Sequence, residues 1–252
     1  MTTSPAGAQV AVHRRGIGLK ITVMLLPLMG SVTLLFKFFG LAFSALLPVI
    51  NPLGSALVLM GLIGNAPGGV FRNLARRIAI NTILFLIAIE MGGTAALSFF
   101  GISLPVVQVA GGLTLAAMGW SLLNQGESDS RRRQAEMAEI DFTSLEQKAF
   151  YPFTFPITAG PGTIVVMLTL AAHAAVKGAI PSTMAHGGIL LAVVVLSLLV
   201  FASYAYAPRI TQYISPQTAH GILRVIAFVL LCIGVQITWN GVEAMLKTVL
   251  RS

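Results

Sequence analysis

The stretch Asn51-Pro52-Leu53-Gly54 interrupts an apolar run, from about residue 34 to 63, that is long enough to cross a bilayer. A second interruption, Ala159-Gly160-Pro161-Gly162, lies inside the run from about 149 to 175. Proline removes a backbone donor and clashes with the preceding turn, and glycine loosens the backbone beside it. We therefore expect two broken helices at membrane depth. Lipid cannot satisfy the freed carbonyl and amide groups, so they should line an enclosed or watery cavity.

The composition is that of an integral membrane protein. Hydrophobic residues make up 56% of the chain and charged residues 10%, whereas soluble domains carry about 25% charged residues. The apolar runs mostly exceed about 18 residues and do not alternate with period two, which favours an all-α bundle over a β-barrel. Six transmembrane helices are expected, near residues 34–63, 78–100, 105–123, 149–175, 183–206 and 222–246.

The net charge of +8 follows the loops between these helices. Basic residues gather near 72–77, 131–148 and 209–224, whereas the loops at 101–104 and 176–182 carry only Lys177. The positive-inside bias therefore places the basic loops in the cytoplasm and both ends of the bundle outside. The positive charge is thus explained as a signal that orients the helices in the membrane. The lipid bilayer is the expected partner, and no nucleic acid is expected.

Four segments follow from these patterns. Residues 1–31 form an N-terminal extension, residues 32–123 a first three-helix repeat, residues 124–148 a solvated cytoplasmic linker, and residues 149–252 a second three-helix repeat. Basic residues followed by a short apolar stretch leave three readings of the extension open: a signal peptide, an extra membrane segment, or a start-site extension outside the fold.

The two halves look like inverted repeats. Each opens with a Pro/Gly-broken helix and ends with a span that carries a small residue in similar register, Gly119 in the first half and Gly234 in the second. Three spans per half is an odd number, so a tandem copy must insert upside down. Helices 1 and 4 would then meet near the midplane, as in secondary transporters.

The first break offers three candidate binding residues. Asn51 supplies an amide donor and acceptor, Pro52 frees a carbonyl, and Gly54 would let a ligand approach the backbone. The alternative is a proline kink that serves packing only.

The second break offers five more candidates. A helix restarting after Gly162 would direct free N–H groups and a positive dipole end at a carboxylate, with a hydroxyl on either side. The substrate-binding candidates of this break are Thr158, Gly160, Pro161, Gly162 and Thr163.

Glu90 is a candidate for ion coupling. A charge at the centre of a span costs on the order of 3 kcal/mol unless it faces a cavity or a partner. The alternative is a solvated position near the outer interface. His173 and His186 bracket the fourth loop without Asp, Glu or Cys at ligand spacing, so no metal site is expected. Cys232 has no second cysteine for an internal disulfide.

Four ordered motifs carry a family resemblance that covers roughly residues 32–250. They are Leu47-Pro48-Val49-Ile50-Asn51-Pro52-Leu53-Gly54, then Phe100-Gly101-Ile102-Ser103-Leu104-Pro105 with Val109-Ala110-Gly111-Gly112, then Ala159-Gly160-Pro161-Gly162-Thr163-Ile164, and Cys232-Ile233-Gly234-Val235-Gln236. Together they resemble the MarC family of bacterial inner-membrane proteins. The resemblance implies six spans, an inner-membrane location and membership of a group also called neutral amino acid transporters.

The sequence thus predicts a multi-pass inner-membrane secondary transporter of small solutes, with neutral amino acids as the expected class. No nucleotide-binding P-loop is present, so an ion gradient would drive it, and no cofactor is expected. An enzyme is not expected, because the spans show no catalytic constellation. A membrane scaffold or regulatory protein without flux remains the alternative. The substrate, direction, coupling ion and oligomeric state, a homo-oligomer included, are left open.

Overall fold

The computed structural model describes residues 30–63, 67–124, 147–209 and 216–250. These residues are almost entirely helical and contain no strand. A first helix covers residues 30–50 and is followed by α2 (Pro52–Ile63), α3 (Gly68–Phe99) and α4 (Leu104–Asn124). The second half contains a short turn of helix, η2 (Gln147–Ala149), an irregular segment, η3 (Phe150–Thr158), and three long helices, α6 (Pro161–Ala174), α7 (Ala179–Ala205) and α9 (Pro216–Val249).

Five helical stretches are long and apolar enough to cross a membrane, and the number rises to six if η3 and α6 form one bent span. In four of the five, no more than 28% of the most apolar window is buried inside the protein. The rest of this apolar surface faces outward, as expected of helices surrounded by lipid. The structure therefore confirms an all-α membrane protein. Residues 1–29 of the predicted N-terminal extension and residues 125–146 of the predicted linker lie outside the described residues, whereas residues 30 and 31 belong to the first helix.

Helices α3 and α9 extend beyond the predicted apolar runs at the ends that carry arginines. We expected Arg72, Arg76 and Arg77 in a loop, but they lie in the first three turns of α3. Arg224 likewise lies within α9. A helix satisfies its own backbone hydrogen bonds and Arg is a good helix former, so the helix continues past the apolar segment.

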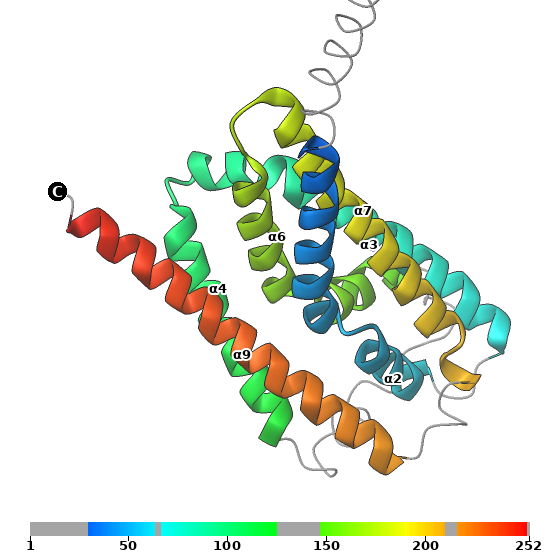
Figure 1. Ribbon diagram of the computed structural model, residues 1–252. Helices are drawn as coiled ribbons and strands as arrows, with labels where there is room; N and C mark the ends of the chain where they lie inside the picture. Colours follow the sequence, from blue (N-terminus) through cyan, green and yellow to red (C-terminus); the bar gives the residue numbers. More distant parts are fainter. Residues whose placement is uncertain (1–29, 64–66, 125–146, 210–215, 251–252) are drawn as a thin grey trace, which may run out of the picture.

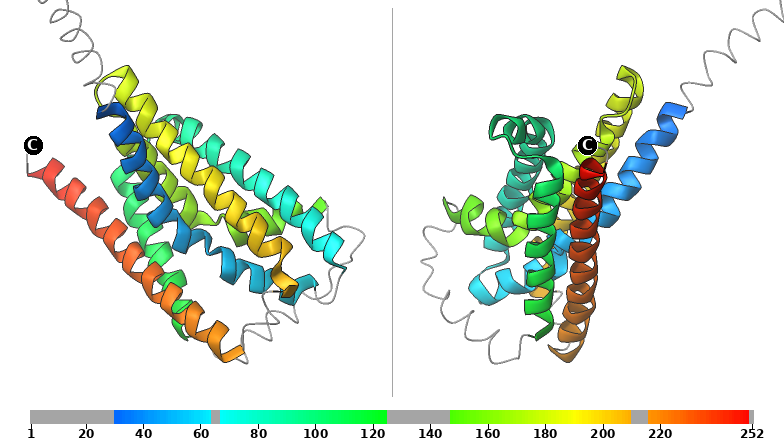
Figure 2. Two further views of the ribbon diagram at one scale, coloured as in Figure 1. Left: turned by 45° about the vertical axis from the view of Figure 1, so that its right-hand side comes forward. Right: turned by 90° about the vertical axis from the view of Figure 1, so that its left-hand side faces the viewer.

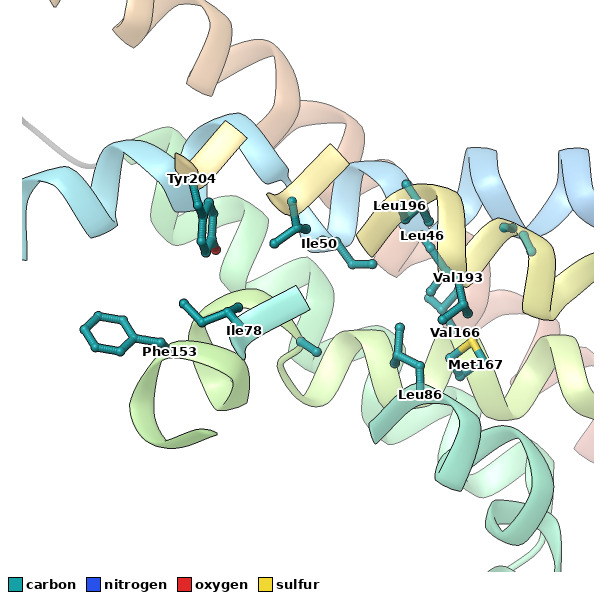
Figure 3. Close-up of a cluster of buried hydrophobic side chains, with 14 of the residues drawn as sticks. Leu46, Ile50, Ile78, Leu86, Phe153, Val166, Met167, Val193, Leu196 and Tyr204 are labelled. Carbon is teal, nitrogen blue, oxygen red and sulfur yellow. The ribbon is translucent and has the colours of Figure 1, made fainter. Parts of the chain in front are cut away.

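Helix α7 is the centre of the bundle. It packs against α2, α3 and α6, and its buried positions recur at helical spacing from Ala185 to Tyr204. Figure 3 shows the resulting core, with Tyr204 and Phe153 at one end and Leu86 and Met167 at the other. The first helix also crosses α7 closely, since a Cβ on Gly188 would lie 2.9 Å from the Phe39 backbone nitrogen.

Helices α4 and α9 lie side by side as a second layer (Figures 1 and 2). Glycines make this contact backbone to backbone. A Cβ on Gly234 of α9 would lie 2.7 Å from the carbonyl oxygen of Gly112 in α4, and a Cβ on Gly119 of α4 would lie 2.6 Å from the backbone nitrogen of Leu231 in α9. Small residues at such crossings let membrane helices approach closely.

Equivalent spans of the two predicted halves contact one another. The second spans, α3 and α7, pack together, as do the third spans, α4 and α9, while α2 of the first broken span touches η3 of the second. An inverted repeat would produce these three pairings because its axis relates each span to its partner. The repeat itself stays a prediction.

Candidate functional site

The first predicted break is present at Asn51, which adopts a left-handed conformation with φ of 45°. Its backbone N–H donates to the carbonyl oxygen of Leu47 (2.9 Å), which closes the first helix. Its side-chain Oδ1 accepts the N–H of Gly54 (3.0 Å), which caps α2. Pro52 occupies the first helical position, where its missing donor has no cost. Asn51 therefore ends one helix and begins the next.

Gly54 has a local role in this arrangement. A Cβ at this position would lie within 2.9 Å of Asn51 Oδ1 and closer still to the rest of that amide. The absence of a side chain at Gly54 thus makes room for the cap itself. Ligand approach, which we expected from the sequence, is not needed to explain this glycine.

The second predicted break is a bend of 64° between η3 and α6. Gly160 is the N-cap and Pro161 the first residue of α6, so the helix restarts two residues earlier than expected. The reason is that proline is well suited to the first turn. The amides of Thr163 (3.0 Å) and Ile164 (3.3 Å) both donate to the Gly160 carbonyl oxygen. They are therefore already partnered within the helix.

Packing explains the two glycines of the second break. A Cβ on Gly160 would lie 2.9 Å from the carbonyl oxygen of Pro156, and one on Gly162 would lie 2.7 Å from the Leu115 side chain in α4. Thr163 differs from these neighbours. Its side chain is fully buried, and its Oγ1 has no hydrogen-bond partner among the described residues. A buried hydroxyl without a partner costs about 1–3 kcal/mol, so Thr163 is the unsatisfied polar group of this break.

The two breaks meet through Ser55 and Tyr204. Ser55, in the first turn of α2, donates from Oγ to the carbonyl oxygens of Ile50 (3.0 Å) and Ile157 (3.4 Å). The second of these bonds joins segments 102 residues apart in the chain. Tyr204 of α7 brings its hydroxyl to 2.8 Å from Thr158 Oγ1, and the Ser55 side chain lies close to that hydroxyl.

Thr158 completes this buried network. Its Oγ1 donates to the Phe153 carbonyl oxygen (2.7 Å), so it receives its bond from Tyr204. Ser55, Thr158 and Tyr204 are all buried. Polar groups in such a place stabilise one arrangement when each has a partner, so the network fixes how the two breaks face one another.

A cavity of about 440 Å³ adjoins the first break. Its walls come from the first helix, α2, α7 and α9, and none of them carries a charged side chain. Asn51 and Ser203 supply its polar groups. The Oδ1 atom of Asn51 is used by the cap, whereas no hydrogen bond of its Nδ2 group is found among the described residues. The lining residues are Leu47, Pro48, Asn51, Pro52, Leu53, Leu199, Ser203, Val225, Ile226 and Val229. The second break does not line this cavity.

Glu90 of α3 is buried and shares a short hydrogen bond between its Oε1 and Nδ1 of His186 in α7. The imidazole is about one-third exposed. The hydrogen bond to His186 therefore offsets the free-energy cost of burying the Glu90 carboxyl group in a membrane span. Lys37 is exposed, and His173 bonds to the Thr169 carbonyl oxygen, so neither pairs with Glu90.

Sequence reasoning did not single out Ser55 or Tyr204, and it did not pair His186 with Glu90. The position of Ser55, one turn after Asn51, was an available signal. No pattern along the chain connects Tyr204 to Thr158. Among the described residues, no group of three His, Cys, Asp or Glu side chains could hold a metal ion.

Comparison with known proteins assigns the chain to a family. The model of the "MarC family integral membrane protein" matches residues 36–246. The chain is 28% identical over 216 residues to the "UPF0056 inner membrane protein MarC" of Escherichia coli O157:H7, and 29% identical over 226 residues to that of Citrobacter koseri. Each alignment covers 85% of this chain and 98% of the relative. No solved structure matches. The predicted resemblance is therefore confirmed: the chain belongs to the MarC family of multi-pass inner-membrane proteins.

Proposed function

We propose that the protein is a secondary transporter of small, net-neutral solutes, with neutral amino acids as the principal class. The observation that carries this proposal is the meeting of two broken membrane helices at the bond between Ser55 Oγ and the Ile157 carbonyl oxygen. Paired breaks inside a membrane bundle are typical of transporter binding sites. The family relationship is compatible with transport, although the relatives' names specify no substrate.

The cavity beside the first break favours a solute without net charge. Its walls are apolar, and no charged side chain is present to pair with an ion. An amide donor from Asn51 and a hydroxyl from Ser203 fit a binding site in which a few polar groups orient an otherwise apolar ligand. The unpartnered hydroxyl of Thr163 and the hydroxyl of Thr158, which is bonded to Tyr204, are the polar groups of the second break.

Glu90 and His186 would carry the coupling ion, a proton. With one proton held between them, the Glu90 carboxyl and the His186 imidazole carry no net charge. Loss of that proton leaves a single negative charge, which the imidazole N–H still contacts. The pair joins α3 to α7. Protonation would therefore change a contact at the centre of the bundle.

Counterflow in liposomes tests transport directly. Purified protein is reconstituted into liposomes loaded with an unlabelled neutral amino acid, and entry of the labelled compound is followed across a panel. We expect saturable entry that protein-free liposomes lack. Leu199→Trp, which fills the cavity, should reduce it strongly, whereas Leu191→Trp, a similarly exposed α7 position outside the cavity, should not. Absence of protein-dependent flux across the panel would favour the scaffold or regulatory alternative.

A further inference from the structure

A second groove runs between α3 and α7 at the arginine-bearing end of α3, which the positive-inside bias assigns to the cytoplasm. It has a volume of about 440 Å³. Its polar end is formed by Arg72, Asn73 and Arg76 in the first turns of α3, and its apolar end by Ile80 and Ile83 further along the same helix. At a rise of 1.5 Å per residue, Arg72 and Ile83 are about 16 Å apart along the axis. The groove is therefore amphiphilic along its length.

The basic end has no counter-charge in the part of the chain that the structure describes. The two acidic residues of this part are both paired elsewhere, Glu90 with His186 and Glu243 with Lys247. A neighbouring cavity of about 330 Å³ shares Arg72 and adds Arg209. Guanidinium groups bind phosphate oxygens with paired N–H donors, so this end of the groove suits a phosphate.

Ser197 of α7 provides a separate observation inside the same groove. Its side chain is fully buried in the groove wall, and its Oγ has no hydrogen-bond partner in the described structure. Serine in a helix commonly bonds to the carbonyl four residues earlier, and Ser197 does not. The ester oxygens of a phospholipid are acceptors of the kind that this unused hydroxyl lacks.

We propose that this groove binds an anionic phospholipid. The phosphate contacts Arg72 and Arg76, an ester oxygen accepts the Ser197 hydroxyl, and one acyl chain follows Ile80 and Ile83. A zwitterionic lipid binds more weakly, because its ammonium group would approach the same arginines without a carboxylate to pair with. Basic pockets between helices on the cytoplasmic side are suited to such headgroups. The site is independent of the transport proposal, because its α7 lining (Ser197, Leu198 and Phe201) differs from that of the cavity beside Asn51 (Leu199 and Ser203) and the two cavities share no residue.

Native mass spectrometry of the delipidated full chain in detergent tests the proposal. The protein is titrated with phosphatidylglycerol or with phosphatidylcholine of identical acyl chains. We expect one tightly bound phosphatidylglycerol and a roughly 10- to 30-fold loss of affinity in the double variant R72Q/R76Q. Arg224→Gln is the matched control, because this α9 arginine lines neither basic cavity. Equal binding of the two lipids, or equal losses in R72Q/R76Q and Arg224→Gln, would overturn the site.

Two further arms identify the source of the phosphate and the role of the apolar end. Inorganic phosphate at millimolar concentration should not displace the lipid, and its displacement by phosphate alone would indicate a soluble-anion site instead. Ser197→Ala should weaken phosphatidylglycerol binding about 2- to 10-fold. The same variant should not lower the thermal unfolding temperature of the delipidated protein, because no protein hydrogen bond is lost and an unpartnered buried hydroxyl is removed. Unchanged binding in Ser197→Ala would contradict the assigned depth of the lipid.

Discussion

The hydroxyl groups of Thr158 and Tyr204 lie 2.8 Å apart in the core, and they connect the second helix break to α7. Thr158 donates onward to the Phe153 carbonyl oxygen, so the tyrosine hydroxyl is the donor to Thr158. Ser55 brings the first break to the same tyrosine. One phenol on one helix is thus the common point of the two breaks, a side chain that the predicted meeting of helices 1 and 4 did not include.

Tyr204→Phe tests this common point. The variant keeps the ring in the core and removes one donor, which should lower the free energy of unfolding by about 1–2 kcal/mol. Thermal unfolding in detergent measures the change. Tyr206→Phe is the control, because its ring is half exposed and lies near Arg209 without a hydroxyl bond in the described structure. Equal stability of the two variants would show that the network does not hold the breaks together.

Asn51→Ala should abolish flux in the liposome assay. Alanine removes the cap of α2, typically worth about 1 kcal/mol, and it also disfavours the left-handed backbone at this position. The cavity loses its amide donor at the same time. Asn124→Ala, at the exposed end of α4, is the matched control. Flux is compared at equal amounts of folded protein. If Asn51→Ala has the flux and affinity of the wild type, the first break serves packing only and is not part of the binding site.

Glu90→Gln should separate accumulation from exchange. Glutamine keeps the size of the side chain and cannot carry a proton, so uptake driven by a proton gradient should fall to the level of exchange while counterflow persists. Labelled solute is measured in liposomes with and without an imposed gradient. Glu243→Gln, an exposed acid paired with Lys247 on α9, is the control. Gradient-driven accumulation in Glu90→Gln equal to that of the wild type would exclude the pair as the coupling site.

Gly234→Ala should destabilise the contact between α4 and α9. The added methyl group meets the Gly112 carbonyl oxygen at 2.7 Å and neighbouring backbone atoms, so the helices must separate at a cost of about 1–3 kcal/mol. Gly221→Ala lies on the same helix, where an added Cβ meets nothing within 4 Å. This control should be neutral or stabilising because alanine favours a helix. Thermal unfolding should occur at a lower temperature in Gly234→Ala and at the same or a higher temperature in Gly221→Ala. Equal shifts in the two variants would contradict the close contact.

Cysteine labelling checks the predicted sidedness. In a Cys232→Ser background, a cysteine at Ser103, between α3 and α4, should react with an impermeant thiol reagent in intact cells. A cysteine at Gly69, in the first turn of α3, should be protected until the cells are opened. Both positions are exposed in the structure. Labelling of the Gly69 position from outside would reverse the orientation inferred from the arginines.

The sequence was most informative where a local rule applies. Proline after asparagine, and proline between glycines, located both breaks, because the missing donor and the clash depend only on neighbouring residues. The apolar runs identified the helices, although they missed the charged ends such as Arg72 to Arg77, which continue α3 beyond the apolar part.

Contacts between distant segments could not be read in the same way. Glu90 and His186 are 96 residues apart, and only the packing of α3 on α7 joins them. Gly54 and Gly162 looked like places for ligand approach, yet one makes room for the Asn51 amide and the other for Leu115. A glycine has the same appearance in sequence whether a ligand, a side chain or a helix fills the space beside it.

The central position of α7 has a mechanical consequence. The helix carries His186 near one end and Tyr204 at the other, 18 residues later, or about 27 Å along a continuous axis. The acid–imidazole contact and the phenol contact are therefore fixed to the same rod. A small tilt or rotation of that rod displaces both contacts at once, and no chain of intermediate side chains is needed to couple one contact to the other.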